Sequence, residues 1–231
     1  MPYFVRLQRT PKSPYSSKML LLFQLFLATG LLASFTQPSS WKALEFDGVP
    51  TNRIAYNEGS MTIEVAKSSS PLVSVFPAAV KVREATITGT IKGKLNFGPE
   101  AIWTKKHDDA LLRFGLIEPG TKKLSIIQRL AAPSWIKTLE TMFGGKIEGI
   151  GKIRCFLLMP DASSIGKSRI NPMGDIFIET IQAAPEADGS FVLKISFPDE
   201  PLITSGLWLL ADGDDTDSTF SVTITDISVS E

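Results

Sequence analysis

The sequence predicts an all-β fold, an antiparallel β-sandwich or jelly roll with one short inserted α-helix. Three observations predict it: apolar and polar residues alternate in several segments, short β-branched segments are separated by Gly, Pro and Asp, and one segment has helical spacing. Alternation with a period of two is typical of a strand that buries one face. About ten short strands joined by turn residues are typical of two packed sheets.

The clearest strand is predicted at 82–91, where Ala85, Ile87 and Ile91 share one face and three threonines share the other. The same alternation occurs at 191–197 and 220–224. Further strands are expected at 110–117, 152–158, 175–181 and 206–210, and shorter ones at 43–46, 61–65 and 72–76. Several of these segments are apolar on both faces, which is typical of strands buried on both sides.

One helix is predicted at 133–143. Its spacing places Trp135, Leu139, Met142 and Phe143 on a common face. Pro133 suits the first turn and the following Gly-Gly pair suits the end of a helix. We expect this helix to cover an open end or edge of the sandwich.

The N-terminus has the parts of a secretory signal. Residues 1–34 contain four basic residues, no acidic residue, and a leucine-rich apolar run that ends in small residues. Cleavage is expected after Ala33 or Ser34. An uncleaved signal anchor is the alternative, although the run is shorter than the roughly 20 residues that span a bilayer comfortably. Both alternatives predict export to the periplasm or the extracellular space, with 35–231 as a single β-sandwich domain and no membrane contact beyond the leader.

Composition excludes several classes of function. The chain has 24 basic and 24 acidic residues, and without the leader it carries 20 and 24, a net charge of −4. A mildly acidic exported domain is poorly suited to bind nucleic acid. With one Cys and one His, a cysteine-rich or multi-histidine metal site is excluded. We expect Cys155 to be a buried, inert thiol and His107 to be a solvated turn residue.

The acidic loop 212–218 is the most concentrated polar feature. Alternate oxygens around a glycine resemble the first half of a calcium-binding loop. We therefore predict a structural Ca²⁺ site whose candidate ligands are Asp212, Asp214, Thr216 and Asp217. The alternative is a hairpin in which Asp and Gly only serve the turn.

Two segments carry a resemblance to a known family. Residues 106–114 read K-H-D-D-A-L-L-R-F, and residues 206–216 read G-L-W-L-L-A-D-G-D-D-T. With Trp103 just before the first segment and a final strand after the second, they resemble a family of uncharacterised exported bacterial proteins, a domain of unknown function with a jelly-roll, galactose-binding-like sandwich. The resemblance implies the fold and the exported location, but no activity. If the two segments meet in space, a polar cluster is expected from Asp108, Asp109, Arg113, Asp212 and Asp214.

The leading functional hypothesis is an exported, non-catalytic β-sandwich that binds a carbohydrate or another cell-envelope component. An exposed tryptophan can stack on a sugar, and the other three tryptophans are expected in the core or against the helix. The candidate ligand-binding residues are Trp103, Asp108, Asp109 and Arg113. One alternative is a polysaccharide hydrolase or lyase of jelly-roll type, although the paired carboxylates of a glycosidase motif are missing from the strands. The other is a structural or assembly protein of the envelope.

Overall fold

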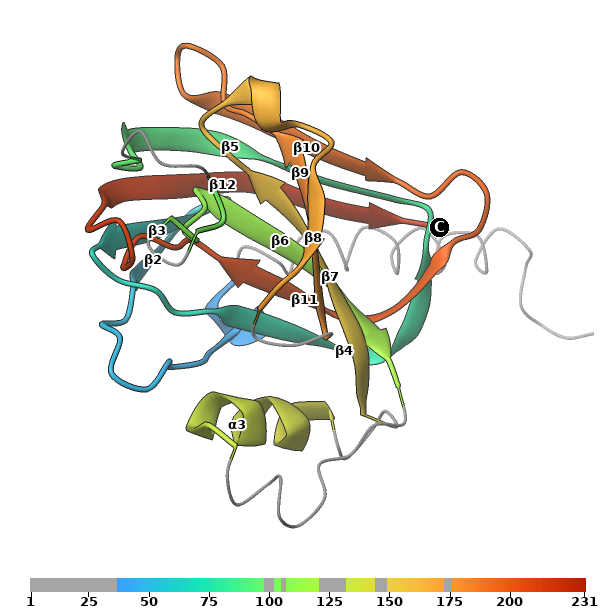
Figure 1. The fold of residues 1–231 in the computed structure, drawn as a ribbon. Coiled ribbons are helices and arrows are strands. Elements are labelled where there is room, and N and C mark those ends of the chain that lie inside the picture. Colours follow the sequence, from blue (N-terminus) through green and yellow to red (C-terminus); the bar gives the residue numbers. More distant parts are fainter. Residues whose placement is uncertain (1–36, 98–101, 105–106, 121–131, 144–148, 173–175) are drawn as a thin grey trace, which may run out of the picture.

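The structure, a computed structural model, describes residues 37–97, 102–104, 107–120, 132–143, 149–172 and 176–231. The predicted signal segment lies outside these residues. Within them the chain forms two β-sheets packed face to face, with one α-helix on the outside of the larger sheet (Figure 1). The prediction of an all-β sandwich is confirmed.

The larger sheet has seven strands among the described residues. In spatial order they are β1 (Lys42–Ala43), β4 (Leu72–Val82), β11 (Leu202–Leu210), β6 (Leu112–Pro119), β7 (Ile150–Leu158), β9 (Phe177–Ala183) and β8 (Ser168–Ile170). Its neighbouring strands are antiparallel except for β7 and β9, which are parallel. Parallel strands need a crossover connection, and the chain between them carries the short 3₁₀ helix η2 (Ala162–Ser164) and the edge strand β8.

The smaller sheet has five antiparallel strands among the described residues. They lie in the order β10 (Ser190–Ser196), β5 (Glu84–Lys94), β12 (Thr219–Ser230), β3 (Ser60–Ala66) and β2 (Arg53–Asn57). A second 3₁₀ helix, η1 (Pro38–Ser40), precedes β1.

The strand alternation divides the buried side chains into two cores. On β11, Leu207 and Leu209 point between the sheets, whereas Trp208 and Leu210 point to the outer face of the larger sheet. The inter-sheet core is closed from the other side by residues such as Val222 of β12. The second core exists because the outer face of the larger sheet is itself apolar over part of its area and must be covered.

Helix α3 (Ser134–Phe143) covers that apolar area. Trp135, Leu139 and Phe143 are its buried residues, and Trp135 packs edge-on against Trp208 at a centroid distance of 6.2 Å. The predicted helix at 133–143 is therefore confirmed, and it covers a sheet face instead of an open end of the sandwich. None of the helices in the described part of the chain is long and apolar enough to cross a membrane.

Two strands were not expected from the sequence. Strand β2 has no fully buried residue, and β8 is only three residues long. Both are edge strands, so the alternation that marks a half-buried strand is missing from them. The three segments with the clearest alternation all occur as strands, β5, β10 and β12.

Candidate functional site

The candidate site lies on the outer face of the larger sheet, beyond the area that α3 covers. Along β11 and the residues that follow it, Trp208 and Leu210 face the apolar core under α3, and Asp212 is next on the same face. On β6, Arg113 points to this face between inward-pointing Leu112 and Phe114. The face thus changes from apolar to ionic along the strands.

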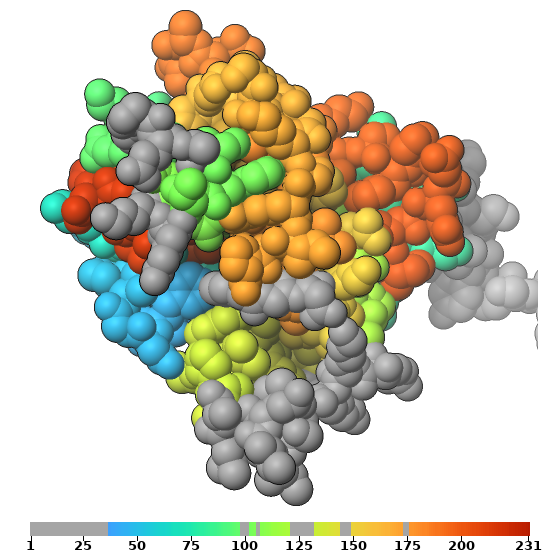
Figure 2. Space-filling view, viewed as in Figure 1, coloured from blue at the N-terminus to red at the C-terminus, as the bar shows by residue number. Residues whose placement is uncertain are grey.

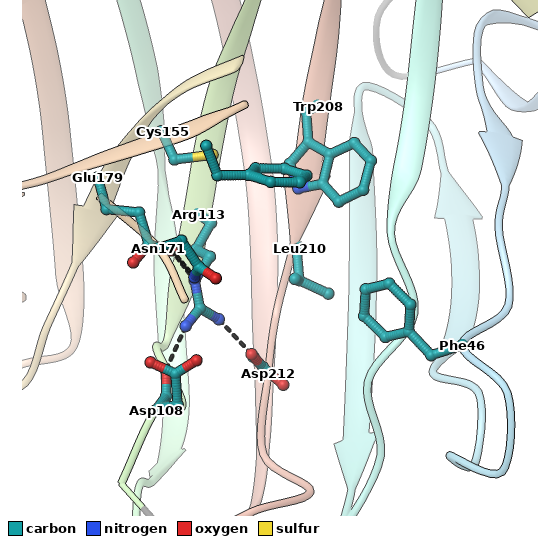
Figure 3. Close-up of a pocket in the computed structure, with 10 residues that line it drawn as sticks. Phe46, Asp108, Arg113, Cys155, Asn171, Glu179, Trp208, Leu210 and Asp212 are labelled. Atoms are coloured by element: carbon teal, nitrogen blue, oxygen red, sulfur yellow. Dashed lines mark hydrogen bonds and ion pairs between the residues drawn. The ribbon is translucent and has the colours of Figure 1, made fainter. Parts of the chain in front are cut away.

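Arg113 is the centre of a buried ion network (Figure 3). Its Nε donates to Glu179 Oε1 at 3.0 Å, its Nη1 donates to a carboxylate oxygen of Asp212, and its Nη2 donates to the backbone carbonyl of Asp108. The side chain of Arg113 is only 4% exposed and that of Glu179 only 1% exposed. Each guanidinium nitrogen therefore has a partner, and the side chain is almost entirely shielded from solvent.

A second arginine reaches the same carboxylate from the edge strand. Arg169 of β8 donates from Nε to Glu179 Oε2 at 2.6 Å and also pairs with the Asp108 carboxylate. Its guanidinium carbon lies 4.8 Å from the ring centroid of Trp103, a cation–π geometry. In the space-filling view, the green surface around 107–112 lies against the orange surface around 161–172 (Figure 2).

The network fixes the protonation state of Glu179. Burial alone would raise the pKa of this carboxyl, but Arg113 and Arg169, with hydrogen bonds from Arg169 and Asn171, outweigh burial and hold the pKa below its usual value. Burial also raises the pKa of the neighbouring Cys155 thiol far above its usual range. The expectation of a buried, inert Cys155 agrees with this environment.

Asp109 ties the acidic loop to β6. Its carboxylate accepts hydrogen bonds from the backbone N–H of Thr216 at 2.8 Å and of Asp215 at 3.3 Å, and from the Thr216 hydroxyl. Asp109 is buried, so it acts as an internal cap for the 212–218 loop.

Three carboxylates converge beside this cap. One oxygen from each of Asp109, Asp212 and Asp214 lies within 4.8 Å of the others. Burial raises the pKa of all three, and raises that of Asp212 to about 7 even though Arg113 opposes the shift. Mutual repulsion of the carboxylates contributes in the same direction.

The structure brings most of the predicted residues together. Arg113 lies in the first of the two segments that carry the family resemblance, as does Asp108, and it reaches Asp212 in the second. Its contacts therefore join the two segments. The predicted site residues that lie in the network or next to it are Trp103, Asp108, Asp109, Arg113, Asp212, Asp214 and Thr216. Asp217 does not face the cluster; it pairs with Lys67 at 3.2 Å, and both side chains are well exposed.

Two expectations about individual residues change. His107 is not solvated: only 9% of it is exposed, its N–H donates to the Thr104 carbonyl, and its ring lies 6.0 Å from that of Phe97. Trp103 is half-buried, with Arg169 over one face of its ring, so that face is closed to a stacked sugar.

Three members of the network were missed in the sequence: Arg169, Asn171 and Glu179. The available signal was the charged Glu179 next to the apolar run 176–178 of a predicted strand, since a charge at such a position needs a partner. Its two arginines come from β6 and β8, far apart in the sequence.

Two hollows accompany the site. The first, about 60 Å³, lies between Arg113, Glu179, Asn171 and the rings of Phe46 and Trp208, and it has room only for a few water molecules. The second is an open depression of about 380 Å³ between the end of β5, Pro160 and the 185–189 turn. It lies next to the acidic loop, because Lys94 pairs with Thr219 and the backbone N–H of Asn96 donates to Ser218 Oγ.

No protein-family model matches the chain, and no curated protein matches it either. What the structure shows is an all-β sandwich with a buried arginine–carboxylate network on the outer face of its larger sheet.

Proposed function

We propose that this protein is an exported, non-catalytic β-sandwich that binds a carbohydrate of the cell envelope. The observation that carries the proposal is the depression of about 380 Å³, a volume within the range of about 300–1,000 Å³ typical of small-ligand sites. Buried Ile91, Leu95 and Leu111 form its apolar part. Exposed charged residues, Lys94, Glu186 and Asp188, surround this part.

This arrangement suits a sugar because a pyranose presents both apolar C–H groups and hydroxyl groups. Apolar contact favours binding, and a few placed polar groups select the orientation. Trp103 is less suited to the role that we expected for it, because Arg169 occupies one face of its ring. The proposed binding surface is therefore the depression and not the Trp103 ring.

The acids that line the depression offer little support for catalysis. They are Glu186 and Asp188, and Asp188 accepts hydrogen bonds from the backbone N–H and hydroxyl of Ser190. Those hydrogen bonds lower the pKa of Asp188, whereas a glycosidase acid needs a raised pKa. The hydrolase or lyase alternative is less well supported for this reason.

The test compares two lysines on one strand. Purified protein is screened on an array of cell-wall and storage polysaccharides, and hits are measured by isothermal titration. Lys94→Ala is expected to weaken binding about 5- to 10-fold, the value of one lost hydrogen bond. Lys92→Ala is the matched control, because Lys92 is exposed on β5 two residues away and does not line the depression.

Three outcomes would contradict the proposal. Silence across the array, together with co-purification of a stable protein partner, would favour the structural or assembly alternative. Release of new reducing ends from a bound polysaccharide would favour the hydrolase. Equal loss of affinity in Lys92→Ala and Lys94→Ala would place binding elsewhere.

Export is tested separately. We expect the full-length chain to be found in the exported fraction of its cell, with a mature mass that corresponds to cleavage after Ala33 or Ser34. An intact chain in the membrane fraction would indicate the uncleaved anchor, and an intact chain in the cytosol would contradict export.

A further inference from the structure

The cluster of Asp109, Asp212 and Asp214 carries more negative charge than its surroundings balance. The exposed Asp215 lies nearby and adds to the negative charge. The nearest buried cation is Arg113, and its guanidinium is shared among Asp212, Glu179 and the Asp108 carbonyl. The second arginine, Arg169, is engaged by Glu179 and Asp108.

Two arginines thus face five buried or partly buried carboxylates in this part of the described structure, with the exposed Asp215 beside them. The five belong to Asp108, Asp109, Glu179, Asp212 and Asp214. Burying excess charge of one sign is costly unless it is paired with a counter-charge or coordinated by a metal. The raised pKa of Asp109, of Asp212 and of Asp214 is consistent with the same imbalance.

A buried hydroxyl provides an independent observation. Ser69 is fully buried, and its Oγ has no partner in hydrogen-bonding geometry. The residue forms an isolated β-bridge with Asp212, and its hydroxyl lies near enough to the Asp212 carboxyl to lower the pKa of that group. The Ser69 hydroxyl therefore lies beside the Asp212 carboxyl without a well-formed hydrogen bond, whereas buried polar atoms are normally satisfied.

We propose that Asp109, Asp212 and Asp214, together with the Ser69 hydroxyl, bind a divalent cation, and that the cation is Ca²⁺. A hard cation prefers oxygen ligands, and Ca²⁺ tolerates an irregular set of them. Mg²⁺ demands near-octahedral geometry and keeps several waters. The cation would balance the excess negative charge and connect the acidic loop, β6 and the segment before β4.

This ligand set differs from the one that the sequence predicts. Asp212 and Asp214 belong to both sets. The Thr216 hydroxyl donates to Asp109, so Thr216 is a positioning residue. Asp217 has a positive φ of 52° and its carboxylate pairs with Lys67 on the outside of the loop. The third carboxylate ligand is instead Asp109, which lies just before β6 and more than 100 positions from the acidic loop in the sequence.

The experiment measures Ca²⁺ binding by full-length protein that has been stripped with a chelator. Titration calorimetry is expected to give a dissociation constant of about 10⁻⁴ to 10⁻³ M, the range of extracellular calcium modules. At 10 mM Ca²⁺ the melting temperature is expected to rise by about 3–10 °C. Mg²⁺ at the same concentration should give a smaller rise.

Two aspartates of one loop provide a matched pair of variants. Asp214→Asn removes a proposed ligand, and we expect it to abolish the Ca²⁺-dependent rise. Asp217→Asn removes the same charge from the same loop, and we expect it to keep the rise. Ser69→Ala changes no charge and is expected to weaken Ca²⁺ binding several-fold.

Each contrary result overturns a stated part of the proposal. If wild-type protein shows neither calorimetric binding nor a change in melting temperature, there is no site. If Asp217→Asn loses the rise as completely as Asp214→Asn, the effect is general electrostatic screening by the cation and not coordination. If Mg²⁺ stabilises the protein as much as Ca²⁺, the assignment to Ca²⁺ is wrong. None of these results depends on carbohydrate binding.

Discussion

Arg113 Nε donates a 3.0 Å hydrogen bond to Glu179 Oε1, although strand β7 lies between their two strands in the sheet. The register places Gly115, Cys155 and Glu179 in one row across β6, β7 and β9. Because two of these positions carry a small side chain or none, the long side chain of Arg113 can cross above β7. The pair therefore links β6 to β9 across β7, on the part of the outer face that α3 leaves uncovered.

Removal of the arginine should destabilise the fold strongly. Arg113→Met leaves Glu179 and Asp212 buried without their shared partner, and breaking such a pair costs about 3–5 kcal/mol. Urea denaturation followed by tryptophan fluorescence measures the loss. Arg154→Met is the control, because the pair of Arg154 with Glu118 is partly exposed and such a pair contributes at most about 1 kcal/mol. Similar losses in the two variants would contradict the buried network.

The lowered pKa of Glu179 predicts acid sensitivity. The groups that face Glu179 are Arg113 of β6, Cys155 of β7, Arg169 of β8 and Asn171. Because the folded-state pKa lies below the unfolded value, this stabilisation is fully present above the unfolded pKa, about 4.3. It is lost as the pH falls through the lower folded-state value.

The measurement is the free energy of unfolding as a function of pH, in wild-type protein and in Glu179→Gln. We expect Glu179→Gln to be less stable at neutral pH and to lose less stability between neutral and acidic pH. Parallel pH curves for the two proteins would show that Glu179 does not contribute to the acid sensitivity.

The fold was predictable because its signals are local. The strand at 82–91 shows strict alternation, and the helix at 133–143 has a clear apolar face and glycines after it. The partners of Arg113 were predictable only in part. Asp108 and Asp212 lie in the two segments that carry the family resemblance, whereas Glu179 and Arg169 meet Arg113 through the parallel pair β7–β9 and the edge strand β8.

His107 shows where local sequence misleads. Its neighbours in K-K-H-D-D are all charged, which suggests solvent. A turn closed by the His107 N–H to the Thr104 carbonyl instead places the ring beside Phe97. Burial of a turn residue depends on what packs over the turn, and that information lies elsewhere in the chain.

Gly115 is expected to tolerate no side chain. A Cβ at this position would lie 2.9 Å from Trp208 Cβ and 3.0 Å from Ile153 Cγ2. Both atoms belong to buried residues in a packed face, so Gly115→Ala should cost about 1–3 kcal/mol by overpacking. Thermal melting measures the loss, and Thr90→Ala at an exposed position of β5 is the control. An unchanged melting temperature in Gly115→Ala would show that the face is loosely packed.

Trp135 should account for most of the docking energy of α3. Its ring lies 5.4 Å from Phe46, 6.2 Å from Trp208 and 6.3 Å from Phe177. Trp135→Ala is expected to cost about 3–5 kcal/mol and to reduce the near-ultraviolet circular dichroism of the aromatic cluster. Ile136→Ala, at a half-buried position on the same helix, should cost less. If the two variants lose equal stability, the helix is not held by this cluster.

The Cys155 thiol should be unreactive in the folded protein. Burial, reinforced by the nearby Glu179 carboxylate, raises the thiol pKa, so the thiolate that reacts with disulfide reagents is scarce and shielded from solvent. We expect no labelling by a chromogenic disulfide under native conditions at pH 8 and one equivalent in concentrated urea. Arg113→Met should accelerate native labelling, because a weakened network opens the site more often. Rapid labelling of native wild-type protein would mean that the face around Arg113 and Glu179 opens to solvent, contrary to the burial of both side chains.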